Sequence, residues 1–338
     1  MGVRAGLEVR LAARPKGEPT ASDFRLVQAP VPEPAPGRLL VRNLYMSVDP
    51  YMRNRMNEGD YYLPPFELDA PMTGGAVGEV LESRYPGLAP GDAVVHDLGW
   101  RQYAVVDGEQ AQPIDPWAEA PLSAYLGALG LPGLAAYVGI KDIAEVRPGD
   151  VVYVSAAAGA VGALAGQIAR LCGASRVIGS AGSAAKVEHL RTRLGFDAAF
   201  NYRDRPVRMQ LRALAPDGID VYFDNVGGDH LEAAMLALRP FGRVALCGTI
   251  AQYASGVPQE GPRTMPLAVS RRLTLRGFLV GDHEHRAEQF RADMLGWLLS
   301  GRVRADETIS EGIENAVAAL LGLFRGANTG KAVVRLAQ

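Results

Sequence analysis

Short apolar runs alternate with longer, helix-like segments over the central part of this 338-residue chain. Such runs are typical of strands buried on both faces of a sheet. They cover residues 151–154, 176–179, 198–201, 221–225, 244–248 and 273–278. The intervening segments predict helices at 163–171, 183–194, 207–215, 230–238 and 266–271. This alternation indicates βαβ units and an α/β fold with a doubly wound parallel sheet.

The first part of the chain has a different pattern. Runs rich in Val, Leu and Tyr at 24–27, 39–44, 75–81, 93–95 and 102–106 are separated by turns that contain Pro and Gly. Such strands predict a partly open barrel or sandwich. We therefore expect a β-rich domain at 1–125 and a parallel-sheet domain at 126–298. The tail, 299–338, is expected to complete the first domain with a helix at 313–324 and a strand at 332–336.

A run of small residues follows the strand at 151–154. A tight glycine turn at this place presents the N-terminal amides of a helix to a pyrophosphate in Rossmann-type folds. The usual pattern is G-x-G-x-x-G; here Ala157 takes the first place, while Gly159 and Gly162 keep the other two. The pattern is weak by itself, because small residues also occur at ordinary strand–helix turns. Loops at 155–162, 180–183, 225–228 and 248–253 follow four strands, so we expect the ligand at that edge.

The end of the second strand indicates which dinucleotide binds. An NAD site would place Asp or Glu there to hold the ribose 2′-hydroxyl, whereas residues 180–183 read Ser-Ala-Gly-Ser. Lys186 and then Tyr202 and Arg203 follow, and hydroxyls with cations suit a phosphate. Lys186 as a solvated helix charge, and Tyr202 as a strand cap, are the alternatives. We favour a 2′-phosphate site and therefore NADP(H).

Composition excludes several classes of function. The charge is nearly balanced, with 35 basic and 37 acidic residues, so no basic surface for nucleic acid or membrane is predicted. No apolar run is long enough to span a membrane and no signal peptide is evident, which predicts a cytoplasmic protein. The two cysteines, Cys172 and Cys247, form no disulfide framework, and with five scattered histidines they suggest no zinc site. We interpret His283 and His285 as part of a solvated helix start.

Nine segments carry a resemblance to a known family. They are MSVDPYMR (46–53), GALGLPGLAAYVGI (127–140), VYVSAAAGAVGALAGQIAR (152–170), GSAGSAAKVEHL (179–190), LGFDAAFNY (194–202), GIDVYFDNVGG (218–228), CGTIAQY (247–253), RGFLVGD (276–282) and NTGKAVV (328–334). In this order they resemble the medium-chain dehydrogenase/reductase superfamily. Within it they are similar to the zinc-free prostaglandin reductase, leukotriene 12-hydroxydehydrogenase and alkenal double-bond reductase branch. The resemblance implies a GroES-like catalytic domain, a Rossmann domain that binds NADPH, and a homodimer formed through the Rossmann domains.

The resemblance also implies roles for individual residues. Lys186 and Tyr202 would meet the 2′-phosphate, and Asn328 would close the site from the tail. The pyrophosphate would lie against Ala160, Val161, Gly162 and Ala163. The ribose and nicotinamide would lie against Asn225, Cys247, Gly248, Thr249, Ile250, Tyr253, Phe278, Leu279 and Val280. Zinc-bearing relatives have a Cys and a Gly-His-Glu motif in the first domain; residues 72–78 here contain no His, and no Cys precedes Cys172.

The reaction implied is the NADPH-dependent reduction of a carbon–carbon double bond conjugated to a carbonyl, as in small enones and alkenals. Without a metal, a hydroxyl donor must stabilise the developing enolate, and Tyr253 is the candidate. Tyr253 packing against the cofactor is the alternative role. Tyr51 is a second candidate, for proton transfer, although a core aromatic role fits it better. A zeta-crystallin-type quinone reductase, a non-catalytic NADPH-binding protein and an alcohol dehydrogenase are the competing functions.

Overall fold

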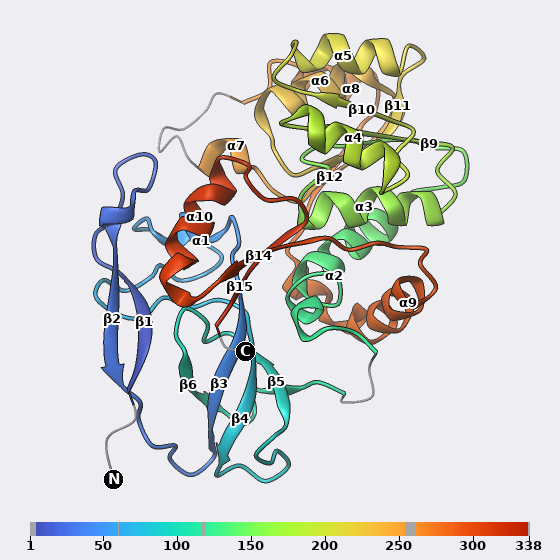
Figure 1. Cartoon of the computed structure of the whole chain (residues 1–338). Coiled ribbons are helices and arrows are strands. Elements are labelled where there is room, and N and C mark those ends of the chain that lie inside the picture. The colour runs from blue at the N-terminus through green and yellow to red at the C-terminus, as the bar shows by residue number, and fades with distance from the viewer. Residues whose placement is uncertain (1–4, 60, 116–118, 254–260, 337–338) are drawn as a thin grey trace. The chain divides into compact units, whose positions relative to one another are not determined.

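The computed structural model describes residues 5–59, 61–115, 119–253 and 261–336 (Figure 1). Contacts within the chain divide it into two compact units. Unit 1 comprises Met1–Leu126 with Glu307–Gln338, and unit 2 comprises Gly127–Asp306. Each unit has its own β-sheet and its own apolar core.

Unit 1 is built on a mixed seven-stranded sheet. Its hydrogen-bonded order is β14-β15-β3-β4-β5-β7, and β6 pairs with β3. The pair β14–β15 is parallel and the other pairs are antiparallel, while β1 and β2 form a separate antiparallel ribbon. The strands are β1 (Ala5–Leu11), β2 (Phe24–Pro30), β3 (Arg38–Ser47), β4 (Ala76–Ser83), β5 (Ala93–His96), β6 (Tyr103–Asp107), β7 (Gln112–Pro113), β14 (Glu307–Glu311) and β15 (Lys331–Arg335). Two α-helices belong to this unit, α1 (Met52–Arg55) and α10 (Ala316–Phe324).

Unit 2 is built on a six-stranded parallel sheet. The order is β10-β9-β8-β11-β12-β13, so the chain starts in the middle, winds to one edge and then to the other. This is the strand order of dinucleotide-binding folds. The strands are β8 (Val151–Val154), β9 (Arg176–Ala181), β10 (Ala198–Asn201), β11 (Ile219–Asp224), β12 (Leu238–Leu246) and β13 (Thr274–Gly277). The helices are α2 (Leu131–Val138), α3 (Ala160–Leu171), α4 (Ala184–Thr192), α5 (Val207–Leu214), α6 (Gly228–Ala237), α7 (Ile250–Tyr253), α8 (Met265–Ser270) and α9 (Ala287–Leu299).

The two sheets confirm the predicted fold class, a doubly wound parallel sheet together with a β-rich mixed sheet. By its internal contacts, unit 2 extends to Asp306. The side-chain amide of Gln167 on α3 exchanges two hydrogen bonds with the backbone of Arg304, at 2.8 and 2.9 Å. His189 on α4 lies 2.7 Å from the carboxylate of Asp306. These contacts hold residues 303–306 to unit 2.

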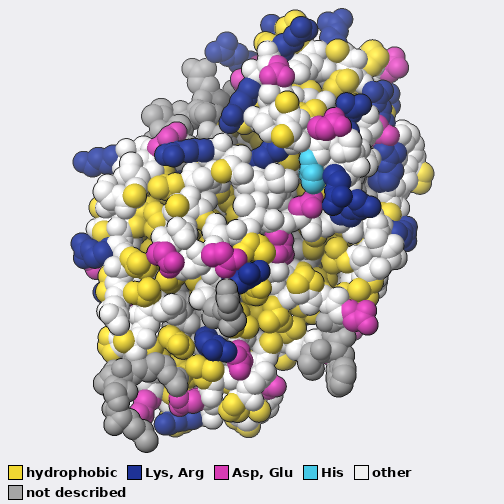
Figure 2. All heavy atoms as spheres, viewed as in Figure 1, with side chains coloured by type: hydrophobic (Ala, Val, Ile, Leu, Met, Phe, Trp, Pro, Cys, Tyr) yellow, Lys and Arg dark blue, Asp and Glu magenta, His cyan; other side chains and the backbone are white. Residues whose placement is uncertain are grey.

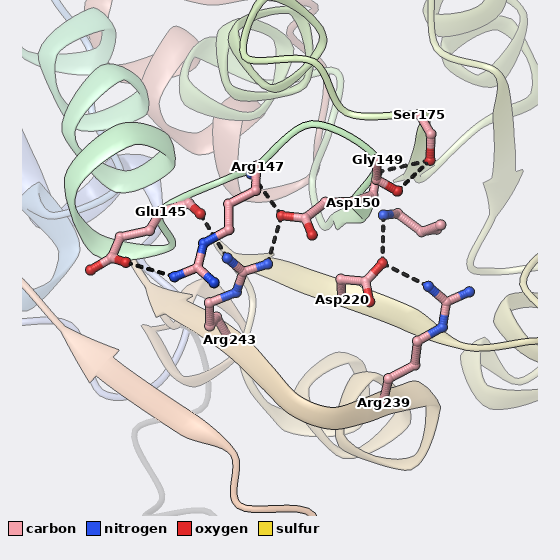
Figure 3. A network of polar contacts seen from close by, with 9 residues as sticks. Glu145, Arg147, Gly149, Asp150, Ser175, Asp220, Arg239 and Arg243 are labelled. Atoms are coloured by element: carbon pink, nitrogen blue, oxygen red, sulfur yellow. Dashed lines mark hydrogen bonds and ion pairs between the residues drawn. The ribbon is translucent and has the colours of Figure 1, made fainter.

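Ion pairs and hydrogen bonds join the segments at the amino ends of the parallel strands (Figure 3). Arg243 lies 2.6 Å from Asp150, immediately before β8. Arg239 lies 2.8 Å from Asp220 on β11, and the same carboxylate accepts from the amide of Val151 at 2.8 Å. This end of the sheet is therefore fixed by charge pairing, which leaves the loops at the opposite, carboxyl ends available for a ligand.

The surface carries both signs of charge. On the face shown in Figure 2, basic and acidic side chains lie interspersed among apolar ones. Within the described ranges, no helix is both long and apolar enough to cross a membrane.

Candidate functional site

The loop between β8 and α3 is shaped to present backbone amides. Gly159 precedes the helix in an extended conformation, with φ −86° and ψ 176°, and no side chain caps the helix. The amides of Ala160, Val161 and Gly162 stand at the N-terminus, where an α-helix offers its first donors and the positive end of its dipole. The amide of Ala163 already donates within the helix, to the carbonyl of Gly159 at 3.0 Å. Three of the four predicted pyrophosphate residues thus lie at an anion-binding position.

Close packing explains why Gly162 of the fingerprint must be a glycine. A Cβ atom on Gly162 would lie 2.5 Å from the carbonyl oxygen of Ala156, so α3 approaches the loop too closely for any side chain there. Ala157 fits at the first fingerprint position because Gly179 faces it on β9, where a Cβ atom would lie 2.9 Å from the Ala157 methyl.

The end of β9 carries hydroxyls and nearby cations. The side chain of Ser183 caps α4 by accepting from the amide of Lys186 at 3.3 Å. Burial and the nearby Arg203 both lower the pKa of Lys186. Tyr202, 38% exposed, holds its hydroxyl over Gly182, where a Cβ atom would lie 2.9 Å from that oxygen. No carboxylate stands in residues 180–183, so this group of residues fits a 2′-phosphate.

Asp224, at the end of β11, holds together the loops that follow β11 and β12. One carboxylate oxygen accepts from the Tyr222 hydroxyl at 2.6 Å and from the amides of Val226 and Gly227 at 2.9 and 2.8 Å. Its backbone carbonyl accepts from the amides of Cys247 and Gly248. The second carboxylate oxygen is buried with no hydrogen-bond partner within the described residues, and burial raises the pKa of Asp224.

Asn225 completes the link to the fingerprint loop. Its side-chain amide donates to the carbonyl of Ser155 at 2.8 Å, and its backbone amide donates to the Ser155 hydroxyl at 3.0 Å. Sequence reasoning named Asn225 but missed the organising roles of Asp224 and Ser155. The available signal was a polar residue at or directly after the end of an apolar strand: Ser155 follows β8, and Asp224 ends β11.

The segment after β12 brings Tyr253 to the same edge. The amide of Ile250 donates to the carbonyl of Asn225 at 3.3 Å, and Thr249 packs near Gly227. The Tyr253 hydroxyl lies 3.8 Å from the place that a Cβ atom of Gly248 would take. Burial, with the charge of Asp224 adding to it, raises the pKa of Cys247 to about 12, so that this thiol stays protonated at neutral pH.

The segment after β13 contributes an aromatic ring and two aliphatic residues. Phe278 packs near Gly139, where a Cβ atom would lie 3.0 Å from the ring, and meets the imidazole of His283 edge-on at 6.2 Å. Leu279 is 44% exposed, and Val280 begins the 3₁₀ helix Val280–Arg286 that contains His283 and His285. All the predicted cofactor residues of unit 2 thus follow carboxyl ends of the parallel strands or begin the helices behind them.

Tyr51 and Asn328 belong to unit 1. Tyr51 packs against the apolar core of that unit, and burial, followed by the charges of Asp49 and Asp97, raises its pKa. Its hydroxyl lies 3.6 Å from the place of a Cβ atom on Gly74. The side chain of Asn328 donates to the carbonyl of Gly330 at 2.8 Å. The core contact fits the structural role we favoured for Tyr51.

The residues of unit 2 fit a dinucleotide phosphate. The N-terminus of α3 matches the pyrophosphate, Lys186 and Tyr202 match the 2′-phosphate, and the missing Cβ of Gly162 lets helix and loop close together. Within the part of the chain that the structure describes, no three His, Cys, Asp or Glu residues are grouped so as to hold a metal ion.

Two family models match the chain, an N-terminal domain of oxidoreductases over residues 8–114 and a zinc-binding dehydrogenase over residues 160–300. The chain is 40% identical over 329 residues to the NADP⁺-dependent 2-alkenal reductase of Nicotiana tabacum, with 95% of each chain covered. It is 38% identical over 332 residues to the NADPH-dependent curcumin reductase of Escherichia coli, covering 97% of this chain and 96% of the relative. The chain belongs to the alkenal and prostaglandin reductase branch of the medium-chain dehydrogenase/reductase superfamily.

A solved structure of this branch has nearly the same fold. CurA from Vibrio vulnificus in complex with NADPH is 39% identical and superimposes with a TM-score of 0.94, covering 98% of this chain and 99% of that one. The family predicted from the nine sequence segments is therefore confirmed. Membership makes this chain an oxidoreductase.

Proposed function

We propose that this reductase uses NADPH to reduce the carbon–carbon double bond of α,β-unsaturated aldehydes and ketones. The observation that carries the proposal is the carboxyl edge of the parallel sheet in unit 2. There, the N-terminus of α3 follows β8, residues 182–186, which contain no carboxylate, follow β9, and Tyr253 follows β12. The NADP-dependence and the alkenal or curcumin substrates named for the relatives support it.

NADPH, when bound, supplies a hydride for the β-carbon of the substrate. The chain holds it through the amides at the start of α3 and through Lys186 and Tyr202. Asn225 keeps the loops in place by its bond to Ser155. Phe278, Leu279 and Val280, just after β13, are proposed to line the nicotinamide side.

Tyr253 is proposed to donate a hydrogen bond to the carbonyl oxygen as negative charge builds on it. A phenol remains protonated at neutral pH and is a donor of the kind that stabilises oxyanions. The neighbouring Cys247 remains a neutral thiol because burial raises its pKa, so no thiolate competes as a nucleophile. Tyr51 is retained as a second candidate for proton transfer to the α-carbon.

We further propose a cytoplasmic homodimer that forms at the edge of the parallel sheet. Strand β13 is the last strand of the sheet, with β12 as its neighbour. Large apolar side chains are exposed near it: Val269 on α8, shortly before β13 in the chain, is 81% exposed, and Phe241 on β12, whose amide donates to the carbonyl of Arg271, is 67% exposed. Exposed apolar groups beside a free strand edge are typical of a protein interface. Light scattering should give twice the chain mass, and V269D should give a monomer.

NADPH absorbance with a panel of acceptors tests the proposed reaction. The panel contains a medium-chain 2-alkenal, a cyclic enone, a quinone and, with NADP⁺, a secondary alcohol. We expect turnover of the alkenal and enone to saturated carbonyl products, faster with NADPH than with NADH. Turnover of the quinone alone would assign the chain to the quinone reductases, and tight NADPH binding without turnover of any acceptor would make it a binding protein.

A further inference from the structure

A buried histidine lies directly behind Tyr202. His230 on α6 is 6% exposed, and its imidazole meets the Tyr202 ring edge-on, with ring centroids 5.3 Å apart and planes at 77°. On its own strand end, Tyr202 is held by its backbone amide, which donates to the carbonyl of Ala181 at 3.1 Å. The imidazole therefore packs against one side of the Tyr202 ring, which is otherwise half-exposed.

The imidazole is itself fixed by a polar network inside the core. Its Nδ1 lies 2.7 Å from the Tyr153 hydroxyl and 3.4 Å from the Ser180 hydroxyl, and those two hydroxyls are 2.9 Å apart. Tyr153 is stacked between Tyr222 and Phe200, at centroid distances of 5.0 and 5.9 Å. The imidazole is hydrogen-bonded to Tyr153, and the Tyr153 ring is itself fixed by stacking. The imidazole is therefore a rigid support for the Tyr202 ring.

The hydrogen-bond network begins on β9, the strand that leads into Gly182, Ser183 and Lys186. Ser180 lies on β9, two residues before Gly182, and its carbonyl accepts from the amide of Ala157 in the fingerprint loop at 2.9 Å. The Tyr202 hydroxyl stands over that same Gly182. One chain of contacts thus runs from the fingerprint loop through Ser180, Tyr153 and His230 to Tyr202.

We propose that His230 is a positioning residue for cofactor selectivity: it holds the Tyr202 ring so that the hydroxyl meets the 2′-phosphate of NADP(H). The inference rests on the proposed binding of NADP(H) and on the proposed role of Tyr202. A tyrosine side chain that is free to rotate loses conformational entropy when it binds a ligand. A side chain already held in place by a neighbouring ring loses less entropy on binding. His230 acts without a charge of its own, because burial lowers its pKa to about 4.

The test compares binding of 2′,5′-ADP and 5′-AMP by calorimetry, since the two differ in the 2′-phosphate alone. The protein is the full chain, and the readout is the ratio of the two dissociation constants. H230L fills the space of the imidazole without a flat ring, whereas H230F restores a ring face without the hydrogen bond. Y202A removes the phosphate contact. H96A is the matched control, because His96 is a second buried, hydrogen-bonded histidine, in unit 1.

We expect Y202A to reduce the preference for 2′,5′-ADP by about tenfold, as for loss of one hydrogen bond to a charged group. H230L should reduce it by a similar factor, with 5′-AMP binding unchanged, whereas H230F and H96A should keep the wild-type ratio. The double variant Y202A/H230L should be no worse than Y202A, since both act through one side chain.

Three other results would overturn the inference in different ways. If Y202A lowers the ratio and H230L does not, His230 has no positioning role while the Tyr202 assignment stands. If Y202A leaves the ratio unchanged, Tyr202 does not bind the 2′-phosphate, and the proposed positioning role of His230 is wrong as well. If the wild-type protein binds 2′,5′-ADP no better than 5′-AMP, the proposed NADP(H) selectivity itself is wrong.

Discussion

The amino group of Lys331 lies 3.1 Å from the carboxylate of Asp49, deep inside unit 1. Lys331 is 3% exposed and also donates to the carbonyls of Val48 and Ala332, at 2.9 and 2.7 Å. Asp49 in turn accepts from the Ser47 hydroxyl. This ion pair ties the tail strand β15 to the turn that carries Tyr51.

Removing one member of this pair should be costly. K331M removes the cation from the largely buried Asp49 carboxylate, whose side chain is 13% exposed, and such a loss from a buried pair destabilises proteins by about 3–5 kcal/mol. The free energy of unfolding in urea measures the effect. R25M is the matched control, because the Arg25–Asp69 pair of the same unit is 62% exposed on both sides and should change stability by about 1 kcal/mol or less. Equal effects of the two variants would contradict the assigned importance of the buried pair.

Tyr253 is expected to act in the chemical step. Y253F removes the hydroxyl and keeps the ring, so NADPH affinity should stay close to the wild-type value. Loss of one oxyanion donor typically costs about 2.7–4 kcal/mol, so kcat for an enone should fall by roughly a hundredfold or more. Steady-state kinetics and fluorescence titration with NADPH separate the two effects. An unchanged kcat would mean that another donor stabilises the enolate.

Alanine substitutions at the two fingerprint glycines should differ in their effects on stability and NADPH binding. A Cβ atom on Gly162 would lie 2.5 Å from a backbone carbonyl, so G162A should lower stability by about 1–3 kcal/mol and weaken NADPH binding as well. A Cβ atom on Gly159 would lie 3.3 Å from the same carbonyl. G159A should keep most of the stability but weaken NADPH binding, because the second glycine lets the backbone approach the pyrophosphate. Unfolding curves and NADPH titrations together decide this; loss of stability in G159A alone would reverse the assignment.

Acid should destabilise the protein through His96. Its Nδ1 accepts from the amide of Leu98 at 3.0 Å, and Nε2 lies 2.9 Å from the Asn43 side-chain oxygen. Protonation of Nδ1 would break the first bond, and burial lowers the pKa of His96 to about 3. The unfolded chain takes up this proton near pH 6.5 and the folded chain does not. Stability is therefore lost as the pH falls from about 6.5 toward 3, by about 1.4 kcal/mol per pH unit.

The variant H96Q removes this titration. Between pH 6 and pH 4.5 its unfolding free energy should fall less steeply than that of the wild type, by about 1.4 kcal/mol per pH unit. The raised pKa values of Asp97 and Asp224 affect both proteins alike, so the difference reports on His96. Parallel pH profiles would show that His96 takes no part in the acid effect.

The parallel sheet could be predicted from the sequence in outline. Strand β12 spans Leu238–Leu246, whereas a strand was predicted only at 244–248, because residues 239–241 are at least partly exposed and form no apolar run. Strands β8 and β10 have the predicted bounds, because each is a buried apolar run flanked by polar or turn residues. Helix α3 begins three residues earlier than predicted, at Ala160, since extended Gly159 rather than the first apolar residue starts it. Strand β14 was not predicted; all of its residues are at least partly exposed, so no apolar pattern marks it.

The loops of the candidate site could be predicted from the sequence, but the contacts between their side chains could not. The loops that follow buried strands were found from their small and polar residues, because strand order places those loops at one edge. The partners of Asp224, and the packing of His230 behind Tyr202, join residues from different strands and helices. Such pairs depend on register and helix placement, which apolar periodicity in one segment does not determine.

The most direct test of the proposed reaction is the fate of the transferred hydrogen. A cyclic enone should be incubated with the enzyme and NADPH that carries deuterium at both C4 positions, and the product analysed by NMR. We expect a saturated ketone with one deuterium on the β-carbon. Deuterium on the carbonyl carbon of an allylic alcohol, or a saturated ketone with no deuterium, would contradict it.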